Sequence, residues 1–211
     1  MLTDHWPLAG LRVRTPRLEL RLPDGAELAA LADVALAGVH PPEQMPFARP
    51  WTDLPPAERG RSVLQHHWRA LADWSAERWV LPLAVFAEGR PVGIQAVQAQ
   101  DFAVLRQVST GSWLGQAHQG QGIGTEMRRA VLHLAFAGLG AEEAVSGAHD
   151  DNPASLAVTR KLGYRPDGVQ RAVVRGRRCT ELRFRLNRAE WAARDEFSIT
   201  GLPPCLPMFG V

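Results

Sequence analysis

Hydrophobic residues near the start of the chain alternate with charged ones, as Leu18, Leu20 and Leu22 do. A period of two is typical of a strand that buries one face, so we expect one strand over residues 11–22. The apolar residues that follow change to helical spacing over residues 24–38, with an Asp to start the helix and a Gly to end it. The chain therefore opens with a strand and a helix.

Both patterns recur along the rest of the chain. Apolar spacing of three and four residues predicts helices over residues 56–78, 125–139 and 152–163. Apolar runs between turn residues predict strands over residues 81–88, 92–100, 105–114, 144–148, 164–174 and 180–186. Strands and helices mixed in this order predict one α/β domain.

A proline-rich segment separates the first two predicted helices at residues 39–56. Its six prolines forbid regular structure. The segment also carries Met45, Phe47 and Trp51, large apolar side chains that a solvated loop has no reason to hold. We therefore expect this loop to do more than connect two helices.

Composition sets the class of protein. The chain has 211 residues, 45% of them hydrophobic and 22% charged, which is typical of a soluble globular domain. A formal charge of +2 argues against nucleic acid or a membrane surface as a partner. Basic charge is nevertheless concentrated in residues 160–188, where 10 Lys and Arg stand against 2 acidic residues, and this concentration suits a small polyanion.

The cysteines and the first residues of the chain predict the cellular compartment. Cys179 and Cys205 lie 26 residues apart, which predicts neither a disulfide framework nor a metal site. The first residues lack a basic segment followed by an apolar one, and no stretch approaches the roughly 20 apolar residues that cross a bilayer. We expect a cytoplasmic protein without a metal.

A glycine-rich stretch, Gln119 to Thr125, stands between a predicted strand and a predicted helix. Glycines let backbone N–H groups approach an anion, and a helix start adds partial positive charge, so the stretch is a candidate phosphate site. A Walker loop would need a Gly-Lys pair, but the only lysine is Lys161. A dinucleotide-binding loop would need a third glycine where Thr125 stands. Both alternatives fit poorly.

The order Gln-x-x-Gly-x-Gly in this stretch resembles the pyrophosphate loop of the GNAT superfamily of CoA-dependent N-acyltransferases. Other motifs are similar to the RimJ/RimL-like branch of that family. They are Thr15-Pro16-Arg17-Leu18-Glu19-Leu20-Arg21, Ser112-Trp113-Leu114, and Asn152-Pro153-Ala154-Ser155 followed by Lys161-Leu162-Gly163-Tyr164. The loop alone is weak evidence, but the ordered set across residues 11–187 is specific.

The resemblance implies the GNAT fold, a mixed, mostly antiparallel sheet of about seven strands flanked by about four helices, with the fourth and fifth strands splayed apart. In the family the pantetheine arm of the acyl-CoA lies in that gap, and backbone amides of the glycine-rich loop bind the pyrophosphate. The implied cofactor residues are Trp113, Leu114, Gln119, Gly120, Gln121, Gly122, Ile123, Gly124, Thr125, Asn152, Ser155 and Arg160. As an alternative to binding phosphate, Arg128, Arg129 and Arg160 form a solvated basic face.

The implied reaction is direct attack of an amine on the thioester, with a backbone N–H near Leu114 stabilising the oxyanion. In most of the family a tyrosine seven residues after the Asn donates a proton to the leaving thiolate, and this chain has Thr159 there. Ser155, with Asn152 as its neighbour, is the replacement that the RimL-like branch suggests. The general base stays open among His149, Asp150, Asp101 and Glu88.

In the family the segment between the first two helices forms one wall of the acceptor-binding site. The resemblance therefore implies substrate contacts from His40, Met45, Phe47 and Trp51. The acceptor is a small-molecule or peptide amine. Acetyl-CoA is the usual donor, and the chain also resembles a small subgroup associated with succinyl-CoA. A succinyl carboxylate would need a cation, for which His40, Arg49 or Arg106 is available. A non-catalytic acyl-CoA sensor is the further alternative, since the tyrosine is missing.

The chain is expected to consist of one domain and a short C-terminal extension. Residues 1–187 are expected to form the acyltransferase domain, and residues 188–211 a C-terminal extension that packs on the domain or on a second subunit. Relatives commonly form dimers, so the resemblance implies a homodimer. The basic residues of 160–188 lack interleaved aromatic residues, so we do not expect nucleic-acid binding.

Overall fold

The computed structural model describes residues 1–193 and 196–211. Its strands are β1 (Arg12–Arg14), β2 (Leu18–Arg21), β3 (Arg78–Ala87), β4 (Arg90–Gln100), β5 (Gln107–Leu114), β6 (Glu143–His149), β7 (Arg165–Val174), β8 (Arg177–Asn187) and β9 (Ser198–Thr200). Its α-helices are α1 (Leu2–His5), α2 (Gly25–Ala37), α3 (Pro56–Ala72), α4 (Phe102–Leu105), α5 (Ile123–His133) and α6 (Pro153–Lys161).

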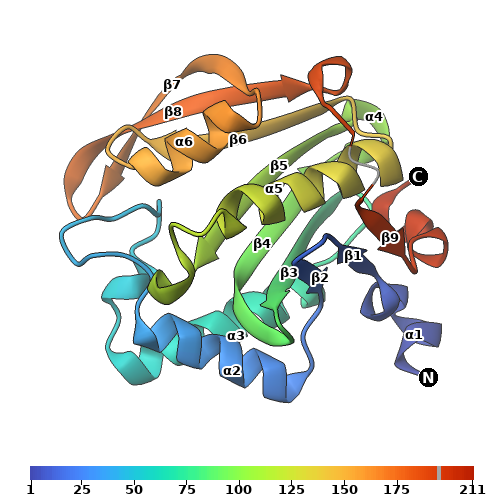
Figure 1. Ribbon diagram of the computed structural model, residues 1–211, viewed down its shortest axis with the longest axis horizontal. Helices are drawn as coiled ribbons and strands as arrows, with labels where there is room; N and C mark the ends of the chain where they lie inside the picture. The colour runs from blue at the N-terminus through green and yellow to red at the C-terminus, as the bar shows by residue number, and fades with distance from the viewer. Residues whose placement is uncertain (194–195) are drawn as a thin grey trace.

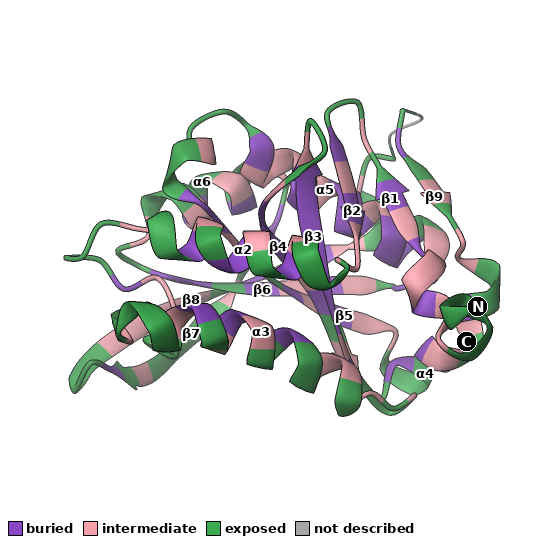
Figure 2. Ribbon diagram, turned by 90° about the horizontal axis from the view of Figure 1, so that it is seen from below, coloured by how far each residue is buried: buried purple, intermediate pink, exposed green. Residues whose placement is uncertain are grey.

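The strands form one sheet in the order β7-β8-β6-β5-β4-β3-β2-β1-β9 (Figure 1). The pair β5 and β6 is parallel and the other pairs are antiparallel, so the predicted mixed, mostly antiparallel α/β sheet is confirmed. Helices α2 and α3 cover one face, and α5 and α6 cover the other, over two hydrophobic clusters. Burial is extensive along β3, near the middle of the sheet (Figure 2). No helix in the described part of the chain is long and apolar enough to cross a bilayer.

The expected splaying of two strands is confirmed at β5 and β6. They pair only where residues 107–109 face residues 143–145. Both strands then continue, β5 to Leu114 and β6 to His149. Their facing edges therefore border a gap that closes at Ser109 and Val145.

The prediction of one strand over residues 11–22 is wrong. This segment is an antiparallel hairpin of β1 and β2, in which Arg14 faces Glu19. Pro16 fixes its own φ and has no N–H to give to a strand, so the chain turns there. The hydroxyl of Thr15 secures the turn by accepting from the Leu18 N–H at 3.0 Å. With β9 added as well, the described residues contain nine strands rather than about seven.

Two helix boundaries also differ from the prediction. The helix expected over residues 56–78 ends at Ala72, because Trp74 turns into the core, where its Nε1–H donates to the Met208 carbonyl at 2.9 Å. The helix expected over residues 125–139 begins at Ile123, ends at His133 and continues as a π turn over Leu134–Gly138. In the first case a contact between residues far apart in the sequence decides where the helix stops.

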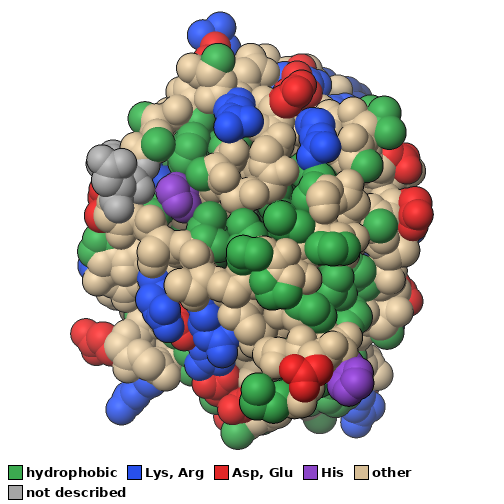
Figure 3. All heavy atoms as spheres, turned by 90° about the vertical axis from the view of Figure 1, so that its right-hand side faces the viewer, with side chains coloured by type: hydrophobic (Ala, Val, Ile, Leu, Met, Phe, Trp, Pro, Cys, Tyr) green, Lys and Arg blue, Asp and Glu red, His purple; other side chains and the backbone are tan. Residues whose placement is uncertain are grey.

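The C-terminal segment packs on the same domain. In residues 188–211, of which 194 and 195 lie outside the described residues, β9 pairs with β1 and the side chains of Cys205 and Phe209 are fully buried. Hydrophobic side chains gather on the end of the molecule where the chain terminates (Figure 3). The segment thus contributes to the core of the domain, and the division at residue 187 stays a prediction.

His67 gives the fold a predicted pH dependence. Its side chain is buried in α3, and this burial lowers its pKa to about 4, against an ordinary value of about 6.5. Between these values the unfolded chain binds a proton that the folded chain does not, so stability present above about pH 6.5 is lost as the pH falls through 4. From pH 7 to pH 5 we expect this group to lower the free energy of unfolding by about 2 kcal/mol. Urea denaturation at both pH values should show that His67→Leu lacks this loss; equal losses in variant and wild type would contradict the prediction.

Candidate functional site

The glycine-rich stretch forms an exposed turn into α5. Gly120 (φ +74°) and Gly122 (φ +81°) both adopt left-handed backbone conformations, which glycine reaches without strain. The Gln119 N–H donates to the Gln116 carbonyl at 3.2 Å, and the Thr125 N–H donates to the Gly122 carbonyl at 3.1 Å. Between them, in this described part of the chain, the amides of residues 120–124 have no backbone acceptor. These five amides form a cradle that could accept an anion, and it is shorter than the predicted stretch of 119–125.

The gap beside β5 is bordered by backbone groups that point into it. The Gly115 N–H donates to the Val92 carbonyl of β4 at 3.0 Å, and backbone groups alternate in direction along an antiparallel strand. The N–H and carbonyl of Leu114 therefore point away from β4 and toward the gap. The Gln119 side chain spans this end of the gap, since its Nε2 donates to the Leu114 carbonyl at 2.9 Å and to the Val39 carbonyl at 2.7 Å. This anchor places the amide cradle at the open end of the gap.

Three residues outside the predicted site hold the cradle. The Thr15 hydroxyl donates to Glu126 at 2.6 Å, and Arg17 Nε donates to the same carboxylate at 2.7 Å. Arg17 also donates from Nη1 to the Gln121 carbonyl at 3.1 Å, which brings a positive charge beside the cradle. In the sequence Thr15 and Arg17 belong to a motif, but 109 residues separate Arg17 from Glu126, and no local signal pairs them.

Helix α6 follows directly from the β6 side of the gap. The Asn152 side chain accepts from the Ser155 N–H at 3.1 Å, so Asn152 caps the helix as its position predicts. Ser155 is half-buried. Thr159, one turn later on the same face, is fully buried, and its hydroxyl has no partner among the described residues.

Two arginines expected on a basic surface lie in different environments. Arg160 is exposed on the last turn of α6. Arg128 is only 5% exposed, so the expectation of a solvated face is wrong for it. Its guanidinium donates to the Ser146 hydroxyl of β6 at 3.0 Å and to the Ser112 hydroxyl of β5 at 3.2 Å. Because α5 packs on the sheet where these strands diverge, this side chain reaches the gap instead of solvent.

On the opposite face of the sheet the proline-rich segment packs against β5. Ring centroids are 5.7 Å apart for His40 and Phe47, 5.4 Å for Phe47 and Trp51, and 5.8 Å for Trp51 and Trp113. This aromatic row joins three predicted acceptor residues to Trp113, which was predicted as a cofactor residue. The imidazole of His40 is held by a backbone carbonyl at 2.8 Å and by the Thr52 hydroxyl at 2.7 Å, so both of its nitrogens are occupied.

Among the candidates for the general base, the geometry favours His149. Its side chain is 4% exposed, and its Nδ1–H donates to the carbonyl of Met45, itself a predicted acceptor residue, at 2.9 Å. Because a carbonyl only accepts, the neutral ring keeps Nε2 as a proton acceptor. The register of the last β5–β6 pair, carried on along both strands, puts His149 opposite Trp113 across the gap.

Glu181 adds a carboxylate beside His149. It faces His149 in the β6–β8 register, and residues paired across two antiparallel strands share a face of the sheet. A Cβ at Gly147 would clash with the Glu181 carboxylate, so this side chain lies directly over β6. No local sequence pattern pairs Glu181 with the gap, because the contact depends on the pairing of two distant strands.

Of the other candidates for a base or a cation, three lie away from the gap and two are exposed at the surface. Asp101 and Arg106 flank α4 at the opposite end of β5, and Glu88 is on the turn between β3 and β4. Asp150 and Arg49 are exposed. Within residues 1–193 and 196–211, no three His, Cys, Asp or Glu side chains are grouped to hold a metal ion.

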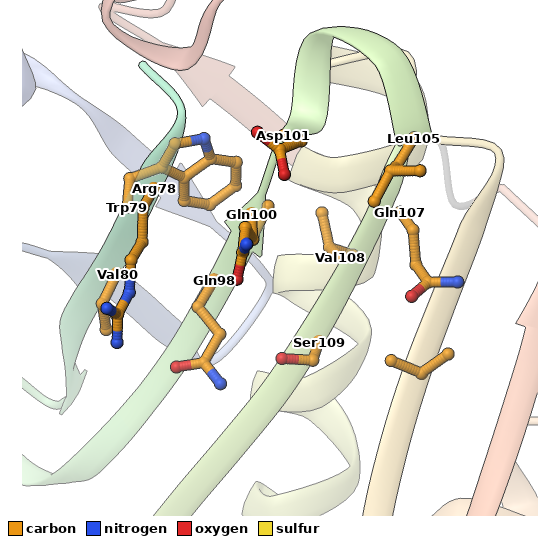
Figure 4. Close-up of a pocket in the computed structure, with 12 residues that line it drawn as sticks. Arg78, Trp79, Val80, Gln98, Gln100, Asp101, Leu105, Gln107, Val108 and Ser109 are labelled. Atoms are coloured by element: carbon orange, nitrogen blue, oxygen red, sulfur yellow. The ribbon is translucent and has the colours of Figure 1, made fainter. Parts of the chain in front are cut away.

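A separate cavity of about 450 Å³ adjoins the closed end of the gap. Its lining combines amide and hydroxyl groups of β4 and β5, such as Gln98 and Ser109, with the rim formed by Asp101 and Leu105 (Figure 4). The full lining is Arg78, Trp79, Val80, Gln98, Ala99, Gln100, Asp101, Leu105, Gln107, Val108, Ser109 and Val145. Asp101 is the one base candidate that it contains.

Comparison with known proteins agrees with this geometry. The family described as "Acetyltransferase (GNAT) domain" matches residues 17–165. Mycobacterium smegmatis RimJ in complex with CoA-disulfide is similar in structure, with a TM-score of 0.72 at 19% identity, covering 95% of this chain and 95% of that chain. RimL, the ribosomal L7/L12 alpha-N-protein acetyltransferase in complex with coenzyme A, has a TM-score of 0.65 at 21% identity, covering 82% of this chain and 95% of that chain. The structural likeness shows the fold, and the family match, which spans most of the sequence, shows that the chain belongs to the acetyltransferase (GNAT) domain family.

Proposed function

We propose that this protein transfers an acyl group from an acyl-CoA to a primary amine by direct attack in a ternary complex. The observation that carries the proposal is the gap between β5 and β6. The amide cradle stands at its open end, and the His149 imidazole stands on the side that the proline-rich segment covers. An anion-binding turn and a positioned base at one opening suit transfer from a phosphorylated donor to an amine.

The residues present fit an acyl-CoA, which supplies an activated thioester when bound. The cradle of residues 120–124 would take the pyrophosphate, with the Arg17 guanidinium beside it. The edge of β5 that faces the gap offers backbone groups near Leu114 to the amides of a pantetheine arm. Trp113, Asn152 and Ser155 flank this path, and Arg160 lies on the outer turn of α6.

Gly122→Ala should weaken the binding of coenzyme A about tenfold. A non-glycine residue at φ +81° costs about 1–2 kcal/mol, so the free loop of the variant relaxes to another conformation and must regain this one to bind. About 1.4 kcal/mol is a factor of ten in affinity. The matched control is Gly89→Ala, at φ +75° on the turn between β3 and β4 and outside the cradle, where a Cβ would meet nothing within 4 Å. Calorimetric titration with coenzyme A measures both; equal dissociation constants for the two variants would argue against the cradle.

The proposed chemistry assigns one role to each group. His149 Nε2 takes the proton of the attacking amine, and Glu181 attracts that amine in its cationic form. The Leu114 N–H donates to the carbonyl oxygen as negative charge develops there. Ser155, held at the helix start by the Asn152 cap, returns a proton to the sulfur, since Thr159 is buried beneath it.

Trp51→Ala should change acceptor preference while leaving the dissociation constant of coenzyme A within about twofold. The aromatic row lies on the face opposite α5, and loss of a buried aromatic surface costs a bound acceptor about 1.5–3 kcal/mol, which is roughly tenfold or more in kcat/KM. Relative kcat/KM values over a panel of amines measure the effect. A parallel loss of coenzyme A affinity would refute this placement of the row.

Release of free thiol from acetyl-CoA and from succinyl-CoA, over a panel of amines, tests the proposed function. Acetyl-CoA is the first donor and succinyl-CoA the second. The panel includes small amines, lysine peptides and peptides with free N-termini, the last because RimL is an alpha-N-protein acetyltransferase. Turnover with one amine above hydrolysis supports transfer. Background rates with every amine, despite tight binding of coenzyme A, would favour a non-catalytic acyl-CoA sensor. In a separate experiment, native mass spectrometry would show whether the proposed homodimer forms.

A further inference from the structure

Arg128 is a buried cation without a counter-charge. Its side chain is 5% exposed between α5 and the sheet, and no ion pair among the described residues involves it. Its terminal nitrogens Nη1 and Nη2 donate to the neutral hydroxyls of Ser146 and Ser112. Its buried Nε has no hydrogen-bond partner among the described residues. A buried charge that lacks an ion-pair partner costs several kcal/mol of folding free energy. This arrangement therefore suits a group that binds an anion.

The surroundings of Arg128 are polar and neutral. The phenol of Tyr164 lies beside both the Arg128 guanidinium and the Thr110 hydroxyl, and the buried hydroxyl of Thr159 has no hydrogen-bond partner in the described chain. Burial raises the pKa of Tyr164 and outweighs the opposing effect of the nearby guanidinium, so the phenol stays neutral and supplies no negative charge. Arginine remains protonated in proteins. The positive charge therefore persists among neutral polar groups.

The position of Arg128 relates it to the reaction gap. Ser146 directly follows Val145, the last β6 residue that pairs with β5, so the guanidinium bridges the two strands just past the closed end of the gap. Ser112 is two residues before Leu114, or about 6.6 Å along the strand. A thioester whose carbonyl meets the Leu114 N–H would lie about that far from the strand position that holds this charge.

We propose that Arg128 is an anion-binding group at the closed end of the gap, and that its ligand is a negative charge carried in by the acyl donor. This inference rests on the proposed function. The charge has two possible sources. When the amine nitrogen bonds to the carbonyl carbon and the C–S bond breaks, the electron pair stays on sulfur as a thiolate until Ser155 returns a proton to it, and the amine proton passes to His149. An acyl group with a terminal carboxylate brings its own charge instead.

The test begins with the wild-type protein. The thiolate absorbance of bound coenzyme A, titrated with pH, gives the pKa of the bound thiol, and calorimetry gives the affinities for acetyl-CoA and succinyl-CoA. A thiolate source predicts a bound thiol whose pKa is at least one unit below that of free coenzyme A, a tenfold gain in thiolate. A carboxylate source predicts that succinyl-CoA binds at least tenfold more tightly than acetyl-CoA. These measurements need no variant to fold.

Variants assign the effect to Arg128. With a thiolate source, Arg128→Gln should lower kcat about 10²-fold with both donors and leave unchanged the affinity for acetyl-CoA, which carries no free thiol. With a carboxylate source, it should raise KM for succinyl-CoA alone. Arg128→Lys should restore part of either effect, and Arg69→Gln, an exposed arginine on α3, is the control for lost charge.

An unshifted thiol pKa together with equal affinity for both donors would overturn this inference and leave the transferase proposal standing. Wild-type effects that persist unchanged in a folded Arg128→Gln variant would overturn it as well. Absence of any coenzyme A binding would instead overturn the proposed function, and this inference with it.

Discussion

Replacing His149 with glutamine is expected to lower kcat for amine acylation by about 10²–10⁴-fold, the usual contribution of a general base. Glutamine keeps a donor for the Met45 carbonyl, which His149 Nδ1 now contacts at 2.9 Å, so the proline-rich segment should stay in place. It lacks the basic Nε2 that takes the amine proton. Steady-state rates at saturating acyl-CoA and amine measure the loss, and the dissociation constant of coenzyme A should stay within about twofold.

Two further variants separate a chemical role of His149 from a structural one. Added imidazole should restore part of the rate to His149→Ala, because a small base can enter the space that the side chain leaves. Asp150→Asn removes the adjacent acid, which is exposed, and should keep nearly the wild-type rate. A kcat of His149→Gln within threefold of the wild-type value would reject the imidazole as the base and make Glu181 the candidate base.

Features of the site that depend on neighbours in the sequence could be predicted from it. The Asn152 cap is a bond between residues three apart, and the left-handed turns at Gly120 and Gly122 need only the local presence of glycine. Each is decided within one turn of chain, where pattern and residue type carry the information. The same holds for the core helices and for most strands.

Features that depend on how distant strands meet could not be predicted in this way. On helix spacing Arg128 looks like part of a charged surface, and its burial follows only from the divergence of β5 and β6 above it. The carboxylate of Glu126 lies 111 residues from the Thr15 hydroxyl that binds it. His149 was one of four open candidates, and the carbonyl that orients it lies 104 residues away. Long-range register decided each of these contacts.

The C-terminal segment presents the same limit, and its contribution to stability is expected to be large. Phe209 is fully buried, with its ring centroid 4.9 Å from that of Trp79 and 5.3 Å from that of Trp74. Phe209→Ala removes a ring from a closed aromatic cluster, so we expect the free energy of unfolding in urea to fall by about 3–5 kcal/mol. Val104→Ala, at a side chain that is 83% exposed, is the control and should change it by less than about 0.5 kcal/mol.

The size of the Phe209→Ala effect decides how this segment relates to the domain. A loss of several kcal/mol in a single cooperative transition means that the last residues belong to the folding unit that carries the reaction gap, because Trp79 lies on β3 in the same core. A loss below about 1 kcal/mol would mean that the aromatic cluster is replaceable and that the segment is an extension attached to a self-sufficient domain. Since β9 pairs with β1, and the β1–β2 hairpin leads into the Thr15 and Arg17 contacts with Glu126, the first outcome would also couple the chain end to the amide cradle.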